Sequence, residues 1–267
     1  MDSEISRILS TSRINGPKYW ARADGDIHAP AGFSTIDVLN TLGNLDVRYD
    51  DYPIVREAID YVFSYYNPAG HFKYNAKSTK LPCITARILT AFGRLGYEDE
   101  RLDSCYRHLL KIQGKDGGWR CPTSKLGKSP ETDASNPGTT LYVLDAFLYR
   151  DNDAKEKKQL ENGVVFLLDH WTTRLPLGPC RFGIGTTFRQ VEYPLIRYNI
   201  LYYCFVLSKY EKALKDKRFQ EAAALLKTKI KDGKLVNENP HRAWREYSFA
   251  QKGKASGPAT KLARGIV

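Results

Sequence analysis

The sequence predicts an all-α protein built as a curved array of helix pairs, and three observations carry this prediction. First, helical segments recur along the 267 residues at intervals of 50 to 57 residues, and a roughly fixed interval between repeats is typical of helical arrays. Second, Gln-Gly-Lys-Asp-Gly-Gly-Trp at 113–119 separates two of these segments. Third, sequence patterns typical of strands are nearly absent. Leucines at matching positions of the segments are 50, 55 and 57 residues apart: Leu39, Leu89, Leu144 and Leu201.

The segment at 113–119 is expected to form a corner between two antiparallel helices. Gly117 and Gly118 can adopt the left-handed backbone conformation that ends a helix, where a side chain would clash. Gln113 is placed to bond carbonyl groups left free at the end of the preceding helix. Trp119 is placed to pack over the turn. A corner of this kind, repeated along the chain, predicts a curved arrangement of helices.

Each repeat is expected to contain two helices of different character. The first helix of a pair, as in LYVLDAFL (141–148), is apolar nearly all round, which requires burial on both sides. The second, as in DSCYRHLLKI (103–112), is charged on one face. This difference predicts an inner ring of apolar helices inside an outer ring of amphipathic helices. In chain order the expected pairs are 34–46 with 55–66, 83–97 with 101–113, 139–150 with 158–171, and 196–210 with 219–231, and 259–267 begins a fifth.

Helix starts and long connections support these boundaries. Pro82 and Pro194 stand at expected helix starts, where a missing amide hydrogen has no cost. In the helix from 83, Ile84, Ile88 and Phe92 fall on one face. Connections as long as those expected here are uncommon unless they are functional. Three segments rich in Gly and Pro are expected to be loops: 14–33, 113–137 and 171–194.

Composition limits the class of protein. Lys and Arg total 41 against 30 Asp and Glu, and a formal charge of +11 favours anionic partners such as nucleic acid, acidic lipid or a phosphorylated small molecule. Seventeen tyrosines fit either a partly polar cavity or a core whose rim reaches water. No stretch has the length of a membrane span or the pattern of a signal peptide. Five cysteines without close pairing suit reduced thiols, and a single cytoplasmic domain over 1–267 is expected.

Several segments together resemble the terpenoid cyclase and protein prenyltransferase superfamily: QGKDGGW (113–119), CITARILTAF (83–92), GTTLYVLDAF (138–147) and FAQKGKASGPATKLA (249–263). The resemblance covers about 30–267 and extends to small bacterial proteins described as prenyltransferase-like or squalene-cyclase-like. It implies an α/α toroid of inner and outer helices around an apolar, aromatic-lined cavity. The candidate lining residues on the inner helices are Tyr142, Tyr198, Tyr202, Tyr203 and Phe205. About four and a half helix pairs leave open whether the ring is complete or whether a homodimer covers the gap.

The signatures of catalysis in this superfamily are largely missing. Squalene and related cyclases protonate their substrate with a DxDD motif, and the matching segment here is Asp133-Ala134-Ser135-Asn136. A serine hydroxyl is far too weak an acid to protonate an alkene, so cyclisation by that route is disfavoured. Protein prenyltransferases hold zinc with Asp, Cys and His. Asp133, Cys121 and His170 show no spacing typical of zinc ligands, so we expect neither a metal nor a cofactor.

The connection at 170–199 is the most distinctive segment outside the repeats. Four arginines next to an aromatic cavity can hold a diphosphate, carboxylate or sulfate group through paired hydrogen bonds. The alternative is a loop tied to helix ends by arginine–carbonyl bonds, and the sequence leaves both interpretations open. The candidate ligand-binding residues from this connection are Trp171, Arg174, Arg181, Arg189, Arg197, Tyr198 and Asn199.

Three functions remain open at this point. The first is a cavity for a hydrophobic, isoprenoid ligand with an anionic head group, either in a prenyl-converting enzyme or in a binding protein. The second is a non-catalytic scaffold whose basic surface binds RNA or another anionic partner. The third is a polysaccharide-active toroid, since Glu131, Asp133 and Asp145 lie near one expected inner helix and hydrolases use paired carboxylates. Asp133, Asp145 and His170 are the catalytic candidates.

Overall fold

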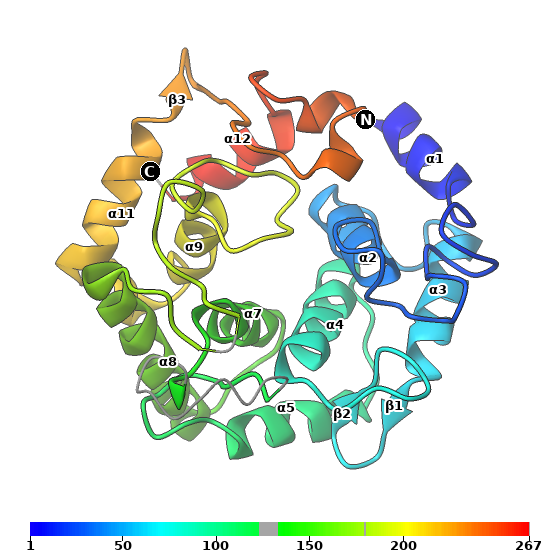
Figure 1. The fold of residues 1–267 in the computed structure, drawn as a ribbon, viewed down its shortest axis with the longest axis horizontal. Helices are drawn as coiled ribbons and strands as arrows, with labels where there is room; N and C mark the ends of the chain where they lie inside the picture. The colour runs from blue at the N-terminus through cyan, green and yellow to red at the C-terminus, as the bar shows by residue number, and fades with distance from the viewer. Residues whose placement is uncertain (123–132, 179, 267) are drawn as a thin grey trace. The chain divides into compact units, whose positions relative to one another are not determined.

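The computed structural model describes residues 1–122, 133–178 and 180–266, and its contacts divide the chain into two compact units, Met1–Lys111 and Ile112–Val267. In both units helices dominate (Figure 1). Within the described residues, paired strands occur as two short antiparallel hairpins, so the expected all-α class is confirmed. No helix in these ranges is both long and apolar enough to cross a bilayer.

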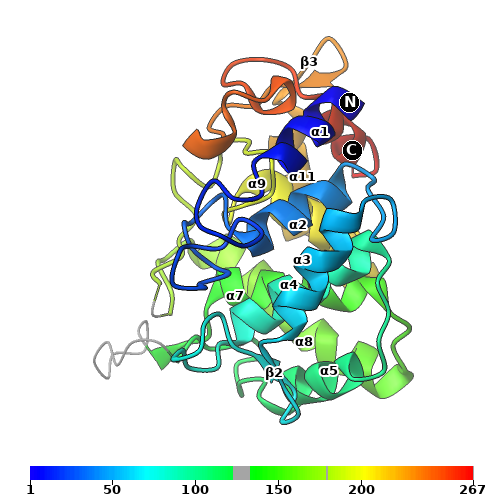
Figure 2. The ribbon, with the colours of Figure 1, turned by 90° about the vertical axis from the view of Figure 1, so that its right-hand side faces the viewer.

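The first unit is built on two buried helices that pack along each other. Helix α2 packs along α4, α3 packs on α2, and α5 packs on α4 (Figure 1). In the view of Figure 2, α3 lies in front of α2 and α4. This is the expected pairing of a buried helix with an amphipathic one. The helices are α1 (Asp2–Ser10), α2 (Thr35–Asn44), α3 (Pro53–Phe63), α4 (Pro82–Leu95) and α5 (Leu102–Lys111).

Local sequence signals begin and end the two buried helices. Ser34 caps α2 and forms a capping box with Asp37, in which each side chain accepts a hydrogen bond from the backbone N–H of the other. Pro82 begins α4, as expected from the sequence. Gly96 ends α4 with a φ of +70°, the left-handed conformation that glycine adopts without strain. A short hairpin follows α3, with β1 (Tyr66–Asn67) paired to β2 (His71–Phe72).

The second unit repeats the plan with two buried helices, α7 and α9. Helix α8 packs on α7, α11 packs on α9, and α8 and α11 touch each other (Figure 1). A second hairpin pairs β3 (Ile230–Lys231) with β4 (Lys234–Leu235), and β4 packs on α12. The helices are α7 (Pro137–Ala146), η1 (Phe147–Tyr149), α8 (Ala154–Thr173), α9 (Ile200–Leu207), α10 (Glu211–Leu214), α11 (Lys217–Lys227), η2 (Arg242–Trp244), η3 (Ser248–Ala250) and α12 (Gly257–Arg264).

Burial separates the two kinds of helix as the sequence predicts. Every residue of α7 is buried, whereas α11 buries only Phe219, Ala222 and Leu226 on one face. Two boundaries differ from expectation. Helix α8 begins four residues early, at Ala154, because Asp153 forms a capping box with Glu156. Helix α9 begins at Ile200 instead of 196 because Asn199 caps it with an extended backbone.

The corner at 113–119 has the predicted left-handed backbone at Gly117 but not at Gly118, and Gln113 forms a different hydrogen bond. Gly117 has a φ of +87°, and Trp119 is fully buried. Gln113 donates its amide hydrogens to the carbonyl of Gly117, 2.6 Å away, and to that of Gln159 in α8, 3.1 Å away. The side chain therefore ties the turn to the next amphipathic helix and does not bond the end of α5. The corner is a tertiary staple as well as a helix stop.

Candidate functional site

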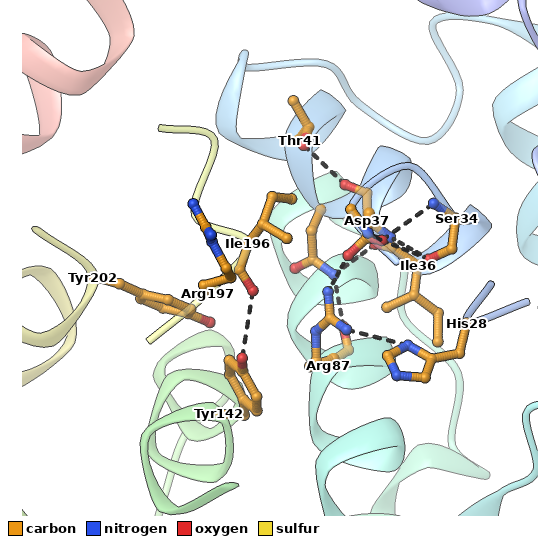
Figure 3. Close-up of polar contacts among 12 residues, drawn as sticks. His28, Ser34, Ile36, Asp37, Thr41, Arg87, Tyr142, Ile196, Arg197 and Tyr202 are labelled. Carbon is orange, nitrogen blue, oxygen red and sulfur yellow. Dashed lines mark hydrogen bonds and ion pairs between the residues drawn. The ribbon is translucent and has the colours of Figure 1, made fainter. Parts of the chain in front are cut away.

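Two tyrosines from the buried helices of the second unit lie side by side. Tyr142 on α7 and Tyr202 on α9 have ring centroids 5.8 Å apart, and both are at least nine-tenths buried. Figure 3 shows the hydroxyl of Tyr142 pointing to the carbonyl of Ile196, which accepts its hydrogen bond at 3.4 Å. Aromatic faces held in this way can contact a hydrocarbon chain and can stabilise a cation that passes along it.

Asp145 is a buried carboxylate beside these tyrosines. It is fully buried on α7 and accepts a hydrogen bond from the Tyr202 hydroxyl at 2.5 Å. The Tyr149 hydroxyl reaches its other oxygen at 3.4 Å. A hydroxyl–carboxylate hydrogen bond as short as that of Tyr202 is among the stronger ones, so Asp145 fixes the orientation of the Tyr202 ring. Asp145 thus holds the Tyr202 side chain by a hydrogen bond. Both residues are among the candidates that the sequence predicts.

His170 is held at the end of α8 by hydrogen bonds at both ring nitrogens. Its Nδ1 lies 3.0 Å from the Tyr198 hydroxyl, and its Nε2 lies 2.9 Å from the carbonyl oxygen of Leu175. Burial lowers the pKa of His170 below its usual value, against the backbone contacts with Leu175 and Phe182, which raise it. In the neutral ring, Nε2–H donates to Leu175 and Nδ1 accepts from Tyr198. The pair therefore serves as a structural link between α8 and the loop before α9.

Trp171 and Tyr198 are packed in an aromatic cluster. Trp171 is 5% exposed, and its ring lies 6.0 Å from Tyr203 and 6.4 Å from Phe188. Phe188 lies 4.7 Å from Tyr198. The indole N–H of Trp171 donates to Glu221 on α11 at 3.3 Å. These contacts hold Phe188 and Tyr198 against α8, and Trp171 links α8 to α11.

The four arginines of this loop have different surroundings. Arg174 and Arg181 are exposed, and the Arg174 guanidinium lies 6.0 Å from the Trp171 ring. Arg189 is half-buried, and its buried Nε has no hydrogen-bond partner among the described residues. Arg197 pairs with Glu192 at 2.5 Å and donates to the carbonyl of Asn239 at 2.9 Å. Arg197 is therefore already neutralised, whereas the Arg189 Nε is a buried donor left without a partner among the described residues.

Asn199 has a structural task in this loop. Its side-chain oxygen accepts hydrogen bonds from the backbone N–H of Leu201 at 2.9 Å and of Tyr202 at 3.2 Å, which caps α9. Its amide donates to the carbonyl of Arg197 at 2.8 Å. All the strong hydrogen-bonding atoms of this buried side chain are thus in use, and Asn199 positions Tyr202 through the first turn of α9.

The segment that resembles the DxDD motif lies between the corner and α7. Asp133 is exposed and pairs with Arg120 at 2.6 Å. The Ser135 hydroxyl donates to Asp116 at 2.7 Å. Asn136 caps α7 by accepting from the backbone N–H of Thr139 at 2.9 Å. The Ser135 hydroxyl is therefore occupied in holding the corner and the Asn136 side-chain oxygen in starting the helix, while the buried Asn136 Nδ2 has no hydrogen-bond partner among the described residues. Glu131, the other carboxylate near this helix, lies outside the described residues.

The first unit contains a buried charged group that sequence reasoning missed. Asp37 on α2 pairs with the guanidinium of Arg87 on α4 and accepts hydrogen bonds from Ser34 and from the backbone N–H of Gly32. The Nδ1 of His28 lies 3.3 Å from Arg87 (Figure 3). A charged residue inside the apolar run CITARILTAF is the signal that could have identified it, because a buried charge needs a partner.

Electrostatics in this group follow from burial and the ion pair. Burial raises the pKa of Asp37, but the Arg87 guanidinium, helped by His28 and Ser34, outweighs it and holds the pKa below its usual value. Burial first, and then Arg87, lower the pKa of His28. Asp37 is therefore an ionised carboxylate at neutral pH and His28 a neutral imidazole. A carboxylate in this state does not protonate an alkene.

Metal ligands do not gather in the described part of the chain. No group of three or more His, Cys, Asp or Glu side chains there is arranged to hold a metal ion. Asp133 pairs with Arg120, His170 bonds Tyr198 and Leu175, and Cys121 contacts Cys180. The three residues weighed as zinc ligands are thus each engaged elsewhere.

Comparisons with known proteins agree with the architecture. No protein-family model and no curated protein matches the sequence. Among solved structures, type II terpene cyclase MstE from Scytonema matches over 99% of this chain and 71% of its own, with a TM-score of 0.50 and 15% identity. A variant of MstE in complex with geranylgeranyl dihydroxybenzoate, its substrate, matches with the same TM-score and identity over 70% of its own length. A variant in complex with the product merosterolic acid A matches at 14% identity with a TM-score of 0.50. This likeness shows that the chain has the terpenoid cyclase-like α/α-toroid fold.

Proposed function

We propose that this protein binds a hydrophobic, isoprenoid molecule that carries an anionic head group. The observation that carries the proposal is the fold: 99% of the chain follows a terpene cyclase whose variants are seen with a geranylgeranyl substrate and with its product. A shared fold does not by itself fix a ligand. Side chains on the buried helices and on the loop before α9 supply the specific support.

The tyrosines of α7 and α9 fit recognition of the apolar tail. The Tyr142 and Tyr202 rings are 5.8 Å apart, and the hydroxyls of both rings are satisfied by Ile196 and Asp145. With their hydroxyls occupied inside the protein, the rings can offer carbon surface to a ligand without leaving a polar group unpaired. Asp145 and Asn199 are positioning residues in this proposal, because both act through Tyr202.

Recognition of the head group is assigned to three arginines. Arg189 has a buried Nε with no described partner, and Arg174 and Arg181 are exposed in the same loop. Arginine binds diphosphate and carboxylate through parallel hydrogen bonds, which suits an isoprenoid diphosphate or a prenylated aromatic acid. Arg197 is left out because Glu192 already compensates its charge.

Protonation-initiated cyclisation is not part of the proposed function. Ser135 and Asn136 occupy acid positions of the resembling motif, and the Ser135 hydroxyl donates to Asp116 while the Asn136 side-chain oxygen accepts from Thr139. Asp133 is exposed and paired with Arg120. Binding, or transfer of a prenyl group that needs no proton donor to an alkene, is consistent with these residues. Product analysis distinguishes the two.

The experiment compares ligands that share a tail or a head. Calorimetric titration of the full chain with geranylgeranyl diphosphate, geranylgeraniol and inorganic diphosphate separates the two contributions. We expect the diphosphate ester to bind most tightly, the alcohol more weakly and inorganic diphosphate weakest, and a crystal structure to place the tail against Tyr142 and Tyr202. Gas chromatography of the incubated ester then shows whether it is turned over. Failure of every isoprenoid to bind, together with salt-sensitive RNA binding, would support the basic interaction module instead.

A further inference from the structure

Two of the five cysteines lie together in the second unit. Cys121 follows the corner at 113–119 and is 3% exposed, whereas Cys180, in the loop after α8, is exposed to solvent. Their thiols share a hydrogen bond. All five cysteines are free thiols in this structure. A buried thiol that touches an exposed one is the arrangement in which thiol–disulfide exchange can begin at the surface and finish inside the protein.

The segments that carry these thiols are both fixed to Asn136. The backbone N–H of Asn136 donates to the carbonyl of Trp119, two residues before Cys121, at 2.9 Å. On the other side, Gly178 lies against Asn136 so closely that a Cβ on Gly178 would come within 2.9 Å of the Asn136 Cα. The start of α7 therefore holds the two cysteine-bearing segments on either side of one residue.

Backbone hydrogen bonds are made by residues on either side of Cys180. The backbone N–H of Leu177 donates to the carbonyl of Phe182 at 3.1 Å, and Arg181 N–H donates to Gly178 at 3.0 Å. The Phe182 ring lies against Gly138 on α7, where a Cβ would come within 2.9 Å of the ring. These contacts hold the backbone on either side of Cys180 next to the start of α7, and the Cys180 thiol touches that of Cys121.

We propose that Cys121 and Cys180 form a reversible disulfide by exchange with a small disulfide such as oxidised glutathione. The Cys180 thiolate attacks one sulfur of the glutathione disulfide, breaks its S–S bond and releases one glutathione thiolate. The Cys121 thiolate then attacks Sγ of Cys180, forms the protein disulfide and expels the second glutathione. Two protein thiols are oxidised by two electrons, the glutathione disulfide is reduced, and the two protons end on the two glutathione molecules.

The reaction has a defined pH dependence. The hydrogen bond that Cys180 donates to Cys121, followed by burial, raises the pKa of Cys180 above its usual value. Only the thiolate attacks a disulfide, so the reaction is slow at neutral pH and accelerates as pH rises. The product joins Cys121 to Cys180, and the residue two positions before each cysteine, Trp119 and Gly178, contacts Asn136. The disulfide is thus a covalent clamp on the start of α7, and it is independent of the proposed ligand.

The test uses the full protein in a glutathione redox buffer at pH 8.5. After acid quenching and alkylation with N-ethylmaleimide, mass spectrometry under non-reducing conditions should find Cys121 linked to Cys180 in one molecule. Cys83, Cys105 and Cys204 should remain thiols, and a reductant should restore both alkylation sites. The melting temperature of the oxidised protein should rise, because a cross-link restricts the unfolded chain.

Matched serine variants identify the order of the two steps. C121S should stop at a stable glutathione adduct on Cys180, and C180S should take up far less glutathione at Cys121, which is shielded from solvent. C204S is the control, since Cys204 is fully buried on α9, and it should still form the cross-link. A wild-type protein that accumulates the Cys180 adduct without the cross-link, or that forms only intermolecular disulfides, would overturn the proposal.

Discussion

The carboxylate of Asp37 pairs with the guanidinium of Arg87, fifty residues later in the chain, at the contact between α2 and α4. Asp37 is 1% exposed and Arg87 8% exposed. The same carboxylate also completes the capping box that begins α2. One side chain thus links a local signal, the start of a helix, to the packing of the first unit.

Removing one charge of this pair should destabilise the first unit strongly. Asp37→Asn keeps the shape of the side chain but leaves the Arg87 charge buried without its partner, and breaking a buried pair costs about 3–5 kcal/mol. Urea unfolding at pH 7 measures the loss. Glu211→Gln is the control, because Glu211 and Lys215 form an exposed pair at 3.1 Å and such pairs are worth at most about 1 kcal/mol. Equal effects of the two substitutions would contradict the assignment.

The same carboxylate should make the first unit sensitive to acid. The folded-state pKa of Asp37 lies below its usual value of 3.8, so its contribution to stability is present above that value and is lost as pH falls toward the folded pKa. Wild-type stability should therefore fall below about pH 4 more steeply than that of Asp37→Asn. Denaturant unfolding at pH 3 to 6 checks this, and parallel curves for the two proteins would be the contrary result.

His170 should contribute an acid response at higher pH. Burial lowers its pKa below the usual 6.5, so the unfolded chain takes up a proton that the folded protein does not. Stability from this residue is present above pH 6.5 and is lost as pH falls, by at most about 1.4 kcal/mol per pH unit for one proton. His170→Asn should show a shallower decline than wild type between pH 6.5 and 5. His28, His71 and His108 also have lowered pKa values, so a residual slope remains.

The corner at 113–119 should not tolerate a side chain at Gly117. Its φ of +87° strains any other residue, and a Cβ would lie 2.6 Å from the carbonyl oxygen of Asn162 in α8. Gly117→Ala should cost about 2 kcal/mol or more in the free energy of unfolding. Gly185→Ala is the matched control, since a Cβ there meets no atom within 4 Å, and it should change stability by less than about 0.5 kcal/mol.

Arg189 should contribute to binding of the head group of the proposed ligand and not to binding of its tail. Arg189→Gln removes a charged donor, and a hydrogen bond to a charged group is worth about 1.5–3 kcal/mol, so Kd for geranylgeranyl diphosphate should rise at least about 10-fold. Binding of geranylgeraniol should be unchanged. Arg197→Gln should leave both affinities near wild type, because Glu192 and Asn239 already occupy that guanidinium. An equal loss of ester and alcohol binding in Arg189→Gln would place this residue outside the head-group site.

Candidate residues fall into two groups when sequence and structure are compared. Tyr142, Tyr202 and Asp145 could be singled out because they lie on helices that are apolar nearly all round, and the structure brings all three together. The Asp37–Arg87 pair could not, because ion pairing joins residues fifty positions apart and depends on how α2 packs along α4. The sequence also could not predict which of the arginines is paired, since the ion pair between Glu192 and Arg197 depends on the fold of the loop.

Sequence alone determined the helical class, the alternation of buried and amphipathic helices and the glycine turn of the corner at 113–119, because these depend on local backbone preferences and on the spacing of apolar residues. Tertiary structure decided which charges are compensated, why Ser135 is bound to Asp116, and how Cys121 meets Cys180. Those relationships join segments far apart in the chain. Their partners are chosen by packing, which periodicity along one segment does not encode.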